Sequence, residues 1–324
     1  MAASPTGWVS DGEFVHHNAS IDHPERPERL VSITAHLTHT GLLERLVEWP
    51  AIPAADEDLM RVHTRAYLTM IERSEGRWLD PDTYVGRNSP AIARLAAGAV
   101  QSAALGVWRG ELTNAFCAVR PPGHHALPDR AMGFCLYNNI AIAAKSVLHA
   151  DPDARVFIVD WDVHHGNGTQ AIFYEDASVL YASVHQYPFY PGTGALHETG
   201  RGKGAGTTVN RPLPAGSGDK EFLGAITDII DNHARPFCPD LVMISAGFDA
   251  HESDPLAGLN VTTHGFGVAT RLVCEFAAEV CAGRVLSVLE GGYNVHALAE
   301  CAEVHLEELL AAAMARHGNR AHAN

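Results

Sequence analysis

The sequence alternates short runs of β-branched and other apolar residues with longer segments of helical periodicity. The apolar runs are "NAFCAV" (114–119), "RVFIVD" (155–160), "SVLYASV" (178–184), "DLVMISA" (240–246) and "RVLSVLE" (284–290). The helical segments include "YNNIAIAAKSVLHA" (137–150), "DKEFLGAITDIIDNHARPF" (219–237) and "TRLVCEFAAEVCAG" (270–283). Runs that are apolar at consecutive positions are typical of parallel strands buried on both faces. The alternation therefore predicts a doubly wound α/β fold with a mostly parallel sheet.

One domain is expected to span residues 1–324, because the chain shows no internal repeat and no low-complexity linker. Its glycine-rich region, 191–218, lies between two predicted strands. The segment "GRGKGAGTT" (200–208) has Gly204 where a phosphate-binding loop needs Ser or Thr after Lys203, so we expect a surface loop. The small and polar residues from about 313 to 324 are expected to fray.

Acidic residues outnumber basic ones, with 38 Asp and Glu against 23 Lys and Arg and a formal net charge of −15. This balance argues against nucleic acid or an anionic membrane as a direct partner. The apolar stretch 90–108 contains Arg94 and Gln101 and follows a capping Ser89, which favours a packed helix over a membrane span. The six cysteines form no C-x-x-C pair and no secretory leader is visible, so buried free thiols and a cytoplasmic location are expected.

The segment "DWDVHH" follows the second predicted strand and carries Asp160, Asp162 and His164 at alternate positions. Side chains two residues apart on a strand project to the same side, so two carboxylates and an imidazole should converge. Taken alone, the pattern is also compatible with ordinary turn and cap residues.

Other predicted strands also end in polar residues that packing does not explain. His124 and His125 follow the first of these strands, Asp249 follows "DLVMISA", and Tyr293 follows "RVLSVLE". Ligands of open parallel sheets bind at the carboxyl ends of the strands. Asp162, His164 and Asp249 are therefore candidate ligands of one divalent ion, with positions left open for water and substrate. The histidine pair could transfer protons, and Tyr293 could donate a hydrogen bond to an oxyanion.

A set of motifs along nearly the whole chain gives a specific resemblance. The motifs are "HPERPERL" (23–30), "VHTRAYL" (62–68), "RPPGHHA" (120–126), "GFCLYNN" (133–139), "DWDVHHGNGTQ" (160–170), "FYPGTG" (189–194), "SAGFDAHESDPL" (245–256) and "LEGGYN" (289–294). With them the chain resembles the zinc-dependent histone deacetylase and acetylpolyamine amidohydrolase family of the arginase-deacetylase superfamily, in particular its class II-like bacterial members. The resemblance implies a sheet of about eight mostly parallel strands flanked by helices on both faces.

The resemblance also implies a role for each candidate residue. One zinc ion would bind Asp162, His164 and Asp249, while Tyr293 would polarise the scissile carbonyl. His125 would be the general acid and base facing Asn167, and His124 would give electrostatic support oriented by Asp160. The substrate tunnel would be formed by Phe134 and Tyr190 with Leu256, Gly133 and Gly292. A structural potassium ion would bind Asp160, Asp162, His164, Ser183 and Val184, largely through backbone oxygens.

Asn167 bears on the chemistry of His125. An aspartate at this position would hold a proton on the histidine more tightly than a neutral amide can. Asparagine should therefore leave His125 readier to act as a base. In the family this asparagine resembles the class II pattern.

The implied reaction is hydrolysis of an acetyl or other short acyl amide by zinc-activated water, with release of acetate. We expect N-acyl-lysine groups of proteins or peptides as substrates, with acetylpolyamines and other small acylated amines as the alternative. Two observations favour acyl-lysine. Only residues 18–22 separate His17 from His23, where polyamine deacetylases resemble one another in a long insertion, and Leu256 stands where polyamine-selective relatives carry an acidic gatekeeper.

Two further functions stay open at this point. A two-manganese ureohydrolase of the same superfamily would need additional bridging carboxylates beyond the single D-x-D-x-H set. A non-catalytic acyl-lysine binding module would not need Tyr293, which is present. Assembly into a homo-oligomer is left open by the sequence.

Overall fold

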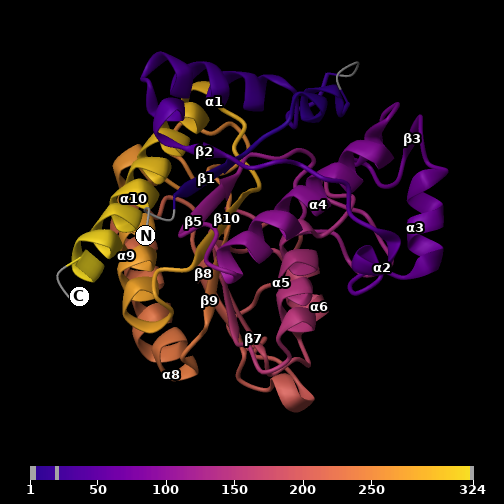
Figure 1. Ribbon diagram of the computed structural model, residues 1–324. Helices are drawn as coiled ribbons and strands as arrows, with labels where there is room; N and C mark the ends of the chain where they lie inside the picture. The colour runs from indigo at the N-terminus through magenta and orange to yellow at the C-terminus, as the bar shows by residue number, and fades with distance from the viewer. Residues whose placement is uncertain (1–4, 19–21, 322–324) are drawn as a thin grey trace.

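The computed structural model describes residues 5–18 and 22–321 of the chain (Figure 1). Its main sheet has eight strands in the order β2-β1-β5-β10-β9-β6-β7-β8, and every neighbouring pair is parallel. The strands are β1 (Thr6–Val9), β2 (Val47–Glu48), β5 (Asn114–Cys117), β6 (Val156–Asp160), β7 (Val179–Gln186), β8 (Thr208–Leu213), β9 (Leu241–Ala246) and β10 (Val285–Leu289). A separate antiparallel pair joins β3 (Arg77–Trp78) to β4 (Tyr84–Val85).

Helices cover both faces of the sheet (Figure 1). One side carries α4 (Ser89–Trp108), α5 (Asn139–Ala150) and α6 (Asn167–Phe173), and the other carries α1 (Glu28–His39), α8 (Arg235–Phe237), α9 (Thr263–Val280) and α10 (Val295–Ala321). The remaining helices are α2 (Asp56–Leu59), α3 (Arg65–Glu72), α7 (Asp219–Ile229), the 3-10 turns Gly12–His16, Leu42–Arg45 and Gly202–Gly204, and the π-helical turn Ile230–Ala234. The α/β architecture predicted from the sequence is therefore confirmed.

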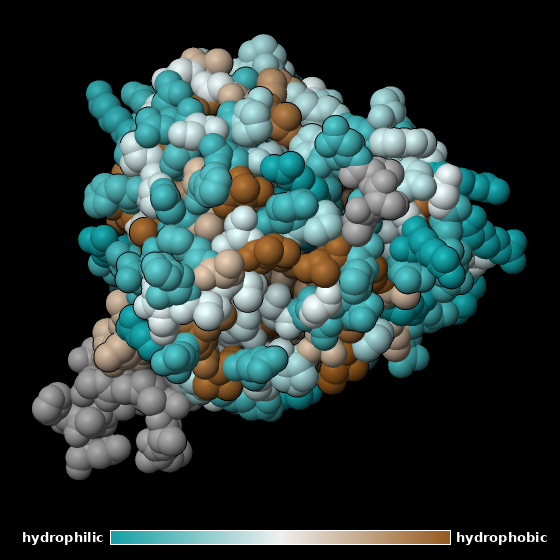
Figure 2. All heavy atoms as spheres, turned by 90° about the horizontal axis from the view of Figure 1, so that it is seen from above, coloured by the Kyte–Doolittle hydropathy of each residue, from teal (hydrophilic) through white to brown (hydrophobic). Residues whose placement is uncertain are grey.

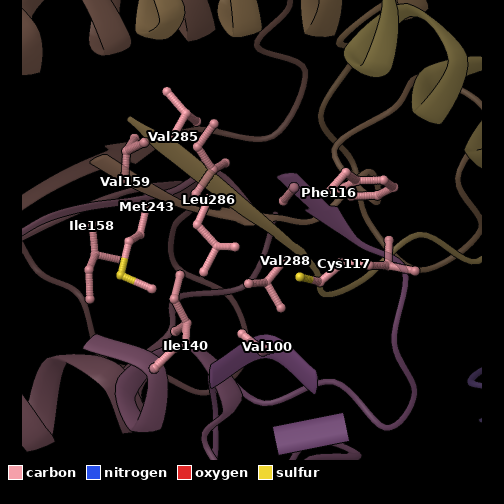
Figure 3. Close-up of a cluster of buried hydrophobic side chains, with 14 of the residues drawn as sticks. Val100, Phe116, Cys117, Ile140, Ile158, Val159, Met243, Val285, Leu286 and Val288 are labelled. Atoms are coloured by element: carbon pink, nitrogen blue, oxygen red, sulfur yellow. The ribbon is translucent and has the colours of Figure 1, made fainter. Parts of the chain in front are cut away.

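The hydrophobic core lies between the sheet and its helices. Ile158, Met243 and Leu286 come from three adjacent strands, and Figure 3 shows them on the side of the sheet that faces Val100 of α4 and Ile140 of α5. All residues of β5, β6, β9 and β10 are buried. This burial on both faces explains why these strands are mostly apolar rather than alternating. The face in Figure 2 is largely hydrophilic, with hydrophobic residues in small groups.

The five predicted strands are present with boundaries close to those expected, but the sequence pattern missed β1, β2 and β8. β8 lies inside the glycine-rich region 191–218, in which no strand was predicted. Its sequence, "TVNRPL", contains a proline and polar residues, and such a strand is tolerated here because β8 is at the edge of the sheet. The segment before it is a loop as predicted, with positive φ at Gly200 and Gly206.

Three further sequence predictions concern the C-terminal end of α10, the burial of α4 and the state of the cysteines. α10 continues to Ala321, where fraying from about residue 313 was expected, because "LLAAAMAR" is rich in strong helix formers; residues 322–324 lie outside the described residues. α4 is long and apolar enough to cross a membrane by length and composition, but 61% of its apolar window is buried inside the protein. Five of the six cysteines are buried and free, and Cys238 is exposed.

Candidate active site and metal centre

The candidate site lies where the central strands of the sheet end. β5, β10, β9 and β6 are neighbours, and parallel strands bring their carboxyl ends to the same edge. Ser245 of β9 is in register with Asp160 of β6 on one side and with Val288 of β10 on the other. The polar segments that follow these strands therefore meet at this edge, as the sequence predicted.

Two carboxylates and one imidazole converge at the edge formed by the carboxyl ends of the central strands. Nδ1 of His164 lies 3.2 Å from Oδ1 of Asp162 and 3.1 Å from Oδ2 of Asp249. One potential ligand atom from each of the three residues lies within 4.8 Å of the others, and both carboxylates are buried. The structure thus brings together the three residues predicted as metal ligands, although Asp249 is 85 positions from His164 in the chain.

Main-chain N–H groups fix the second oxygen of each carboxylate. The N–H of Gly291 donates to Oδ2 of Asp162 at 2.7 Å, and the N–H of Val163 donates to Oδ1 of Asp249 at 2.8 Å. Gly291 also permits the close approach of the chain, because a Cβ at this position would lie 2.5 Å from Oδ2 of Asp162 and still nearer to Asp249. Such supporting contacts orient ligand side chains in metal sites.

The charges of the cluster suit a bound cation. Burial, reinforced by the charge of Asp162, raises the pKa of Asp249 to about 7. Burial opposes a charge on His164, but its hydrogen bonds to Asp162 and Asp249 outweigh burial and raise its pKa to about 10. An imidazole that binds a metal ion must be neutral. A divalent ion bound in the cluster would therefore replace the proton on His164. Two carboxylate oxygens and one imidazole nitrogen are a donor set that fits a catalytic zinc site.

His124 lies in a negatively charged environment. Its Nδ1 is 3.1 Å from Oδ2 of Asp160, and the hydroxyl of Tyr181 donates to the same oxygen at 3.0 Å. Burial disfavours the imidazolium, but the charges of Asp162 and Asp160 prevail and raise the pKa of His124 to about 10. The contact between His124 and Asp160 is the one expected from the sequence, and the two carboxylates favour a proton on the His124 ring.

His125 has the opposite electrostatic environment although it is the next residue. Burial lowers its pKa well below the usual range, and the positive charges of His124 and His164 lower it further. Nδ1 of His125 lies 2.8 Å from Oδ1 of Asn167. An amide oxygen can only accept, so Nδ1 carries the proton and Nε2 of the neutral ring is left as an acceptor. This is the protonation state that a general base needs.

Tyr293 follows β10 and is buried against aromatic and cationic groups. Its ring meets Phe134 edge-to-face at 5.8 Å between centroids, and the guanidinium of Arg29 lies 5.1 Å from its ring. The carboxylate of Asp254 accepts a hydrogen bond from the N–H of Tyr293 at 2.7 Å. Burial and the charge of Asp249 raise the pKa of the phenol well above its usual range, so the hydroxyl remains a protonated donor.

The predicted tunnel residues lie around the histidines and Tyr293. The ring of Tyr190 meets that of His125 edge-to-face at 5.2 Å, and Phe134 packs on Tyr293. Leu256 and Tyr293 line a surface hollow of about 370 Å³. Aromatic and aliphatic walls of this kind suit an apolar ligand chain.

The two predicted tunnel glycines are in close contact with their surroundings. A Cβ at Gly133 would lie 2.8 Å from Cγ of His125, so only glycine lets the chain pack directly on that imidazole. The carbonyl of Gly292 accepts a hydrogen bond from Nε of Arg29 at 2.7 Å. Arg29 also donates to the carbonyl of Glu290, and in this way it fixes the backbone before Tyr293.

Glu290 and Phe189 support the site without having been predicted. Oε2 of Glu290 accepts hydrogen bonds from the N–H groups of Gly123 at 2.7 Å and His124 at 3.1 Å. Phe189 stacks on the ring of His164 with 5.3 Å between centroids. The position of Glu290, an acidic residue at the end of an apolar run, could have marked it as a candidate. Its hydrogen bonds to the backbone of residues 123 and 124 could not be predicted, because backbone N–H groups have no sequence pattern.

Two further predictions concern residues of β6 and β7 and of the segment that follows β6. The strands pair with Asp160 opposite Ser183. The residues predicted to bind potassium therefore lie at and just after the end of β6 and within the neighbouring strand β7. His165 was expected to lie outside the metal ligands. Its Nδ1 lies 2.7 Å from Oγ1 of Thr193 and its Nε2 lies 2.9 Å from Oε1 of Gln170, so both of its nitrogens are engaged away from the cluster.

Comparison with known protein families gives one assignment over most of the chain. The family model described as the histone deacetylase domain matches residues 23–309. A crystal structure described as the HDA15 HD domain superposes with a TM-score of 0.91 at 38% identity, covering 97% of this chain and 92% of that one. This similarity agrees with the eight-stranded parallel sheet.

Curated relatives come from archaea, bacteria and plants. A probable deacetylase of Archaeoglobus fulgidus is 44% identical over 90% of this chain and 82% of its own length. A histone deacetylase-like amidohydrolase of Pseudomonas aeruginosa is 39% identical over 92% of this chain and 80% of its own. Histone deacetylase 15 of Arabidopsis thaliana is 42% identical over 89% of this chain, which spans only 53% of that longer protein.

Proposed function

The chain belongs to the histone deacetylase family, and from this premise we propose that it is a zinc-dependent deacetylase of N-acetyl-lysine side chains in proteins or peptides. One observation carries the proposal: the buried Asp162, His164 and Asp249 cluster lies beside His125, whose ring centroid is 6.1 Å from that of His164, and it is hydrogen-bonded to Gly291, two residues before Tyr293. Together these groups provide a metal site, a base and an oxyanion donor, which amide hydrolysis requires.

Asp162, His164 and Asp249 would hold the zinc ion. Zinc bound there would act as a Lewis acid on the carbonyl and lower the pKa of a coordinated water. The N–H groups of Gly291 and Val163 keep the two carboxylates in place for this binding. His164 must lose its proton on metal loading, so zinc affinity should fall as the pH decreases.

His125 would move the protons of the reaction. Its Nδ1–H would keep donating to the amide oxygen of Asn167, while Nε2 would take a proton from the attacking water and return one to the leaving amine. His124, held as an imidazolium by Asp160, would favour the negative charge that develops in the transition state. The hydroxyl of Tyr293 would donate to the carbonyl oxygen as it becomes an oxyanion.

The walls of the site support an aliphatic acyl-lysine chain over a polyamine. Phe134 and Tyr190 offer aromatic faces, and Leu256 places an apolar side chain in the hollow next to Tyr293. A polyamine carries further cationic amines, whose recognition calls for carboxylates. The hollow has one carboxylate, Asp22, which shares the lining with the cationic Arg26. Acetylpolyamines and other small acylated amines are the alternative substrates.

A substrate panel tests the proposal. Zinc-loaded protein should release acetate faster from an acetyl-lysine peptide than from acetylspermidine or acetylputrescine, and Tyr293→Phe and His125→Ala should each abolish most of that rate. The reverse substrate order would make the polyamine alternative correct. Acyl-lysine binding without acetate release would indicate a binding module. Guanidine hydrolysis with two manganese ions per chain would indicate a ureohydrolase, for which the described residues offer only one candidate cluster.

The proposal also includes a structural potassium ion and a cytoplasmic location. One potassium ion would bind mainly through carbonyl oxygens of Asp160, Asp162 and His164 at the end of β6 and of Ser183 and Val184 in the adjacent strand β7. Replacing potassium by a bulky organic cation should then lower the thermal stability, whereas no change would remove potassium from the proposal. The buried free thiols are consistent with function in the cytoplasm.

A further inference from the structure

A tight turn packs against the ring of His125. The N–H of Cys135 donates to the carbonyl of Met132 at 3.0 Å, and the two residues between them have positive φ angles, 56° at Gly133 and 68° at Phe134. These angles are those of a type I′ turn. Oγ1 of Thr83 accepts a hydrogen bond from the N–H of Phe134 at 3.1 Å. The backbone of the turn therefore has a fixed position beside His125. The sulfur of Met132 accepts from Nδ2 of Asn167 at 3.4 Å and also lies 3.7 Å from Nη2 of Arg130.

The backbone around Asn167 is fixed on the other side of that ring. The N–H of Thr169 donates to the carbonyl of His124 at 3.1 Å. Gly168 approaches so closely that a Cβ there would lie 2.6 Å from the carbonyl carbon of His125. With both backbones held, the main freedom left to Asn167 is rotation of its side-chain amide.

The amide of Asn167 bridges His125 and Met132. Its Oδ1 lies 2.8 Å from Nδ1 of His125, and its Nδ2 donates to Sδ of Met132 at 3.4 Å. A thioether sulfur is only an acceptor. If the amide turned over, its oxygen would face that sulfur with no proton between them, and its NH₂ would face Nδ1 of His125. His125 would then have to carry its proton on Nε2, and the ring could no longer accept a proton there.

We propose that Met132 is a positioning residue that selects the tautomer of His125 through the orientation of the Asn167 amide. The inference rests on the proposed role of His125 as general base, but the tautomer itself can be observed without turnover. Asn167 differs here from an aspartate, whose two oxygens would accept from His125 in either orientation. A neutral amide therefore needs a second partner that distinguishes its two ends, and the sulfur of Met132 is that partner.

Substitution of Met132 tests the proposal in the full-length, zinc-loaded protein. Met132→Leu keeps the volume and removes the acceptor, and Met132→Gln restores an acceptor oxygen. We expect Met132→Leu to lower kcat about threefold to tenfold with KM unchanged, the range that corresponds to one ordinary hydrogen bond, and Met132→Gln to recover most of the loss. Met70→Leu is the matched control, because Sδ of Met70 accepts a hydrogen bond from Ser74 at 3.2 Å far along the chain; it should leave kcat unchanged.

Nitrogen-15 NMR of the histidine rings gives the readout that does not depend on activity. The His125 signals, identified by their loss in His125→Ala, should report the Nδ1–H tautomer in the unsubstituted protein and a mixture with Nε2–H in Met132→Leu. An unchanged tautomer in Met132→Leu would overturn the proposal. Failure of every acyl substrate would instead overturn the proposed function, with the NMR result still deciding the role of Met132.

A double substitution separates tautomer selection from simple packing. In an Asn167→Asp background the residue facing His125 has no donor end, so adding Met132→Leu should cause no further loss of kcat. A loss equal to that seen with Asn167 present would show that Met132 only fills space, and the proposal would be wrong.

Discussion

The close approach of Gly291 to the metal cluster gives a prediction whose size follows from the structure. In Gly291→Ala the added Cβ would lie 2.5 Å from Oδ2 of Asp162, and nearer still to Oδ2 of Asp249. Ordinary contact at these atoms needs roughly 1 Å more, whereas metal ligands tolerate shifts of about 0.2 Å. Both carboxylates are also tied to main-chain N–H groups, so they cannot move without losing a hydrogen bond.

We therefore expect Gly291→Ala to weaken zinc binding at least about 100-fold, equivalent to about 3 kcal/mol. Zinc affinity is measured by competition with a chromogenic chelator, and circular dichroism at the same temperature shows whether the variant is folded. Gly224→Ala in α7 is the matched control, because nothing lies within 4 Å of its Cβ position; it should bind zinc normally. A folded Gly291→Ala protein with unchanged zinc affinity would refute the placement of Asp162 and Asp249 as ligands. If the variant does not fold, Asp249→Asn should show the same loss of zinc.

Three further outcomes follow. Asn167→Asp should raise the pKa of His125 and move the acid limb of kcat/KM to higher pH, because a carboxylate stabilises the imidazolium; a stationary limb would contradict the assigned contact. Tyr293→Phe should lower kcat about 100-fold to 1000-fold without changing zinc affinity, and a parallel loss of zinc would mean that the phenol supports the metal instead. Burial opposes the charge of Glu25, but Arg120 outweighs burial and lowers its pKa to about 2. Its contribution to stability is therefore complete above about pH 4.5 and is lost as the pH falls toward 2, and Glu25→Gln should flatten this part of a urea-unfolding series.

The sequence predicted the central strands because burial on both faces leaves a mostly apolar run. β6, β9 and β10 each contain a single polar residue, Asp160, Ser245 and Ser287 respectively. β8 was missed because an edge strand faces fewer partners and can keep a proline and polar residues, as Arg211 and Pro212 show. Strand periodicity predicted that Asp162 and His164 lie on one side of the chain. They do converge, but β6 ends at Asp160 and residues 162–164 form a bend, so the folded arrangement after the strand brings them together and the expected extended strand does not. The third ligand, Asp249, required knowledge of which strands are neighbours.

Supporting residues were harder to predict than ligands. Glu290 acts on the backbone of residues 123 and 124, and any segment of the chain offers the same N–H groups. The contact between Met132 and Asn167 depends on a turn with two positive φ angles, one of them at Phe134, which no propensity favours. These contacts follow from the folded arrangement rather than from local sequence pattern.

The residues of the candidate metal cluster are synthesised at widely separated points of translation. Asp162 and His164 emerge early, but Asp249 and the Gly291 N–H that anchors Asp162 come 85 and 129 residues later. A nascent or prematurely terminated chain that stops before β10 therefore exposes aspartate and histidine without a closed coordination site. The candidate metal cluster is therefore complete only once the segment that follows β10 has been synthesised.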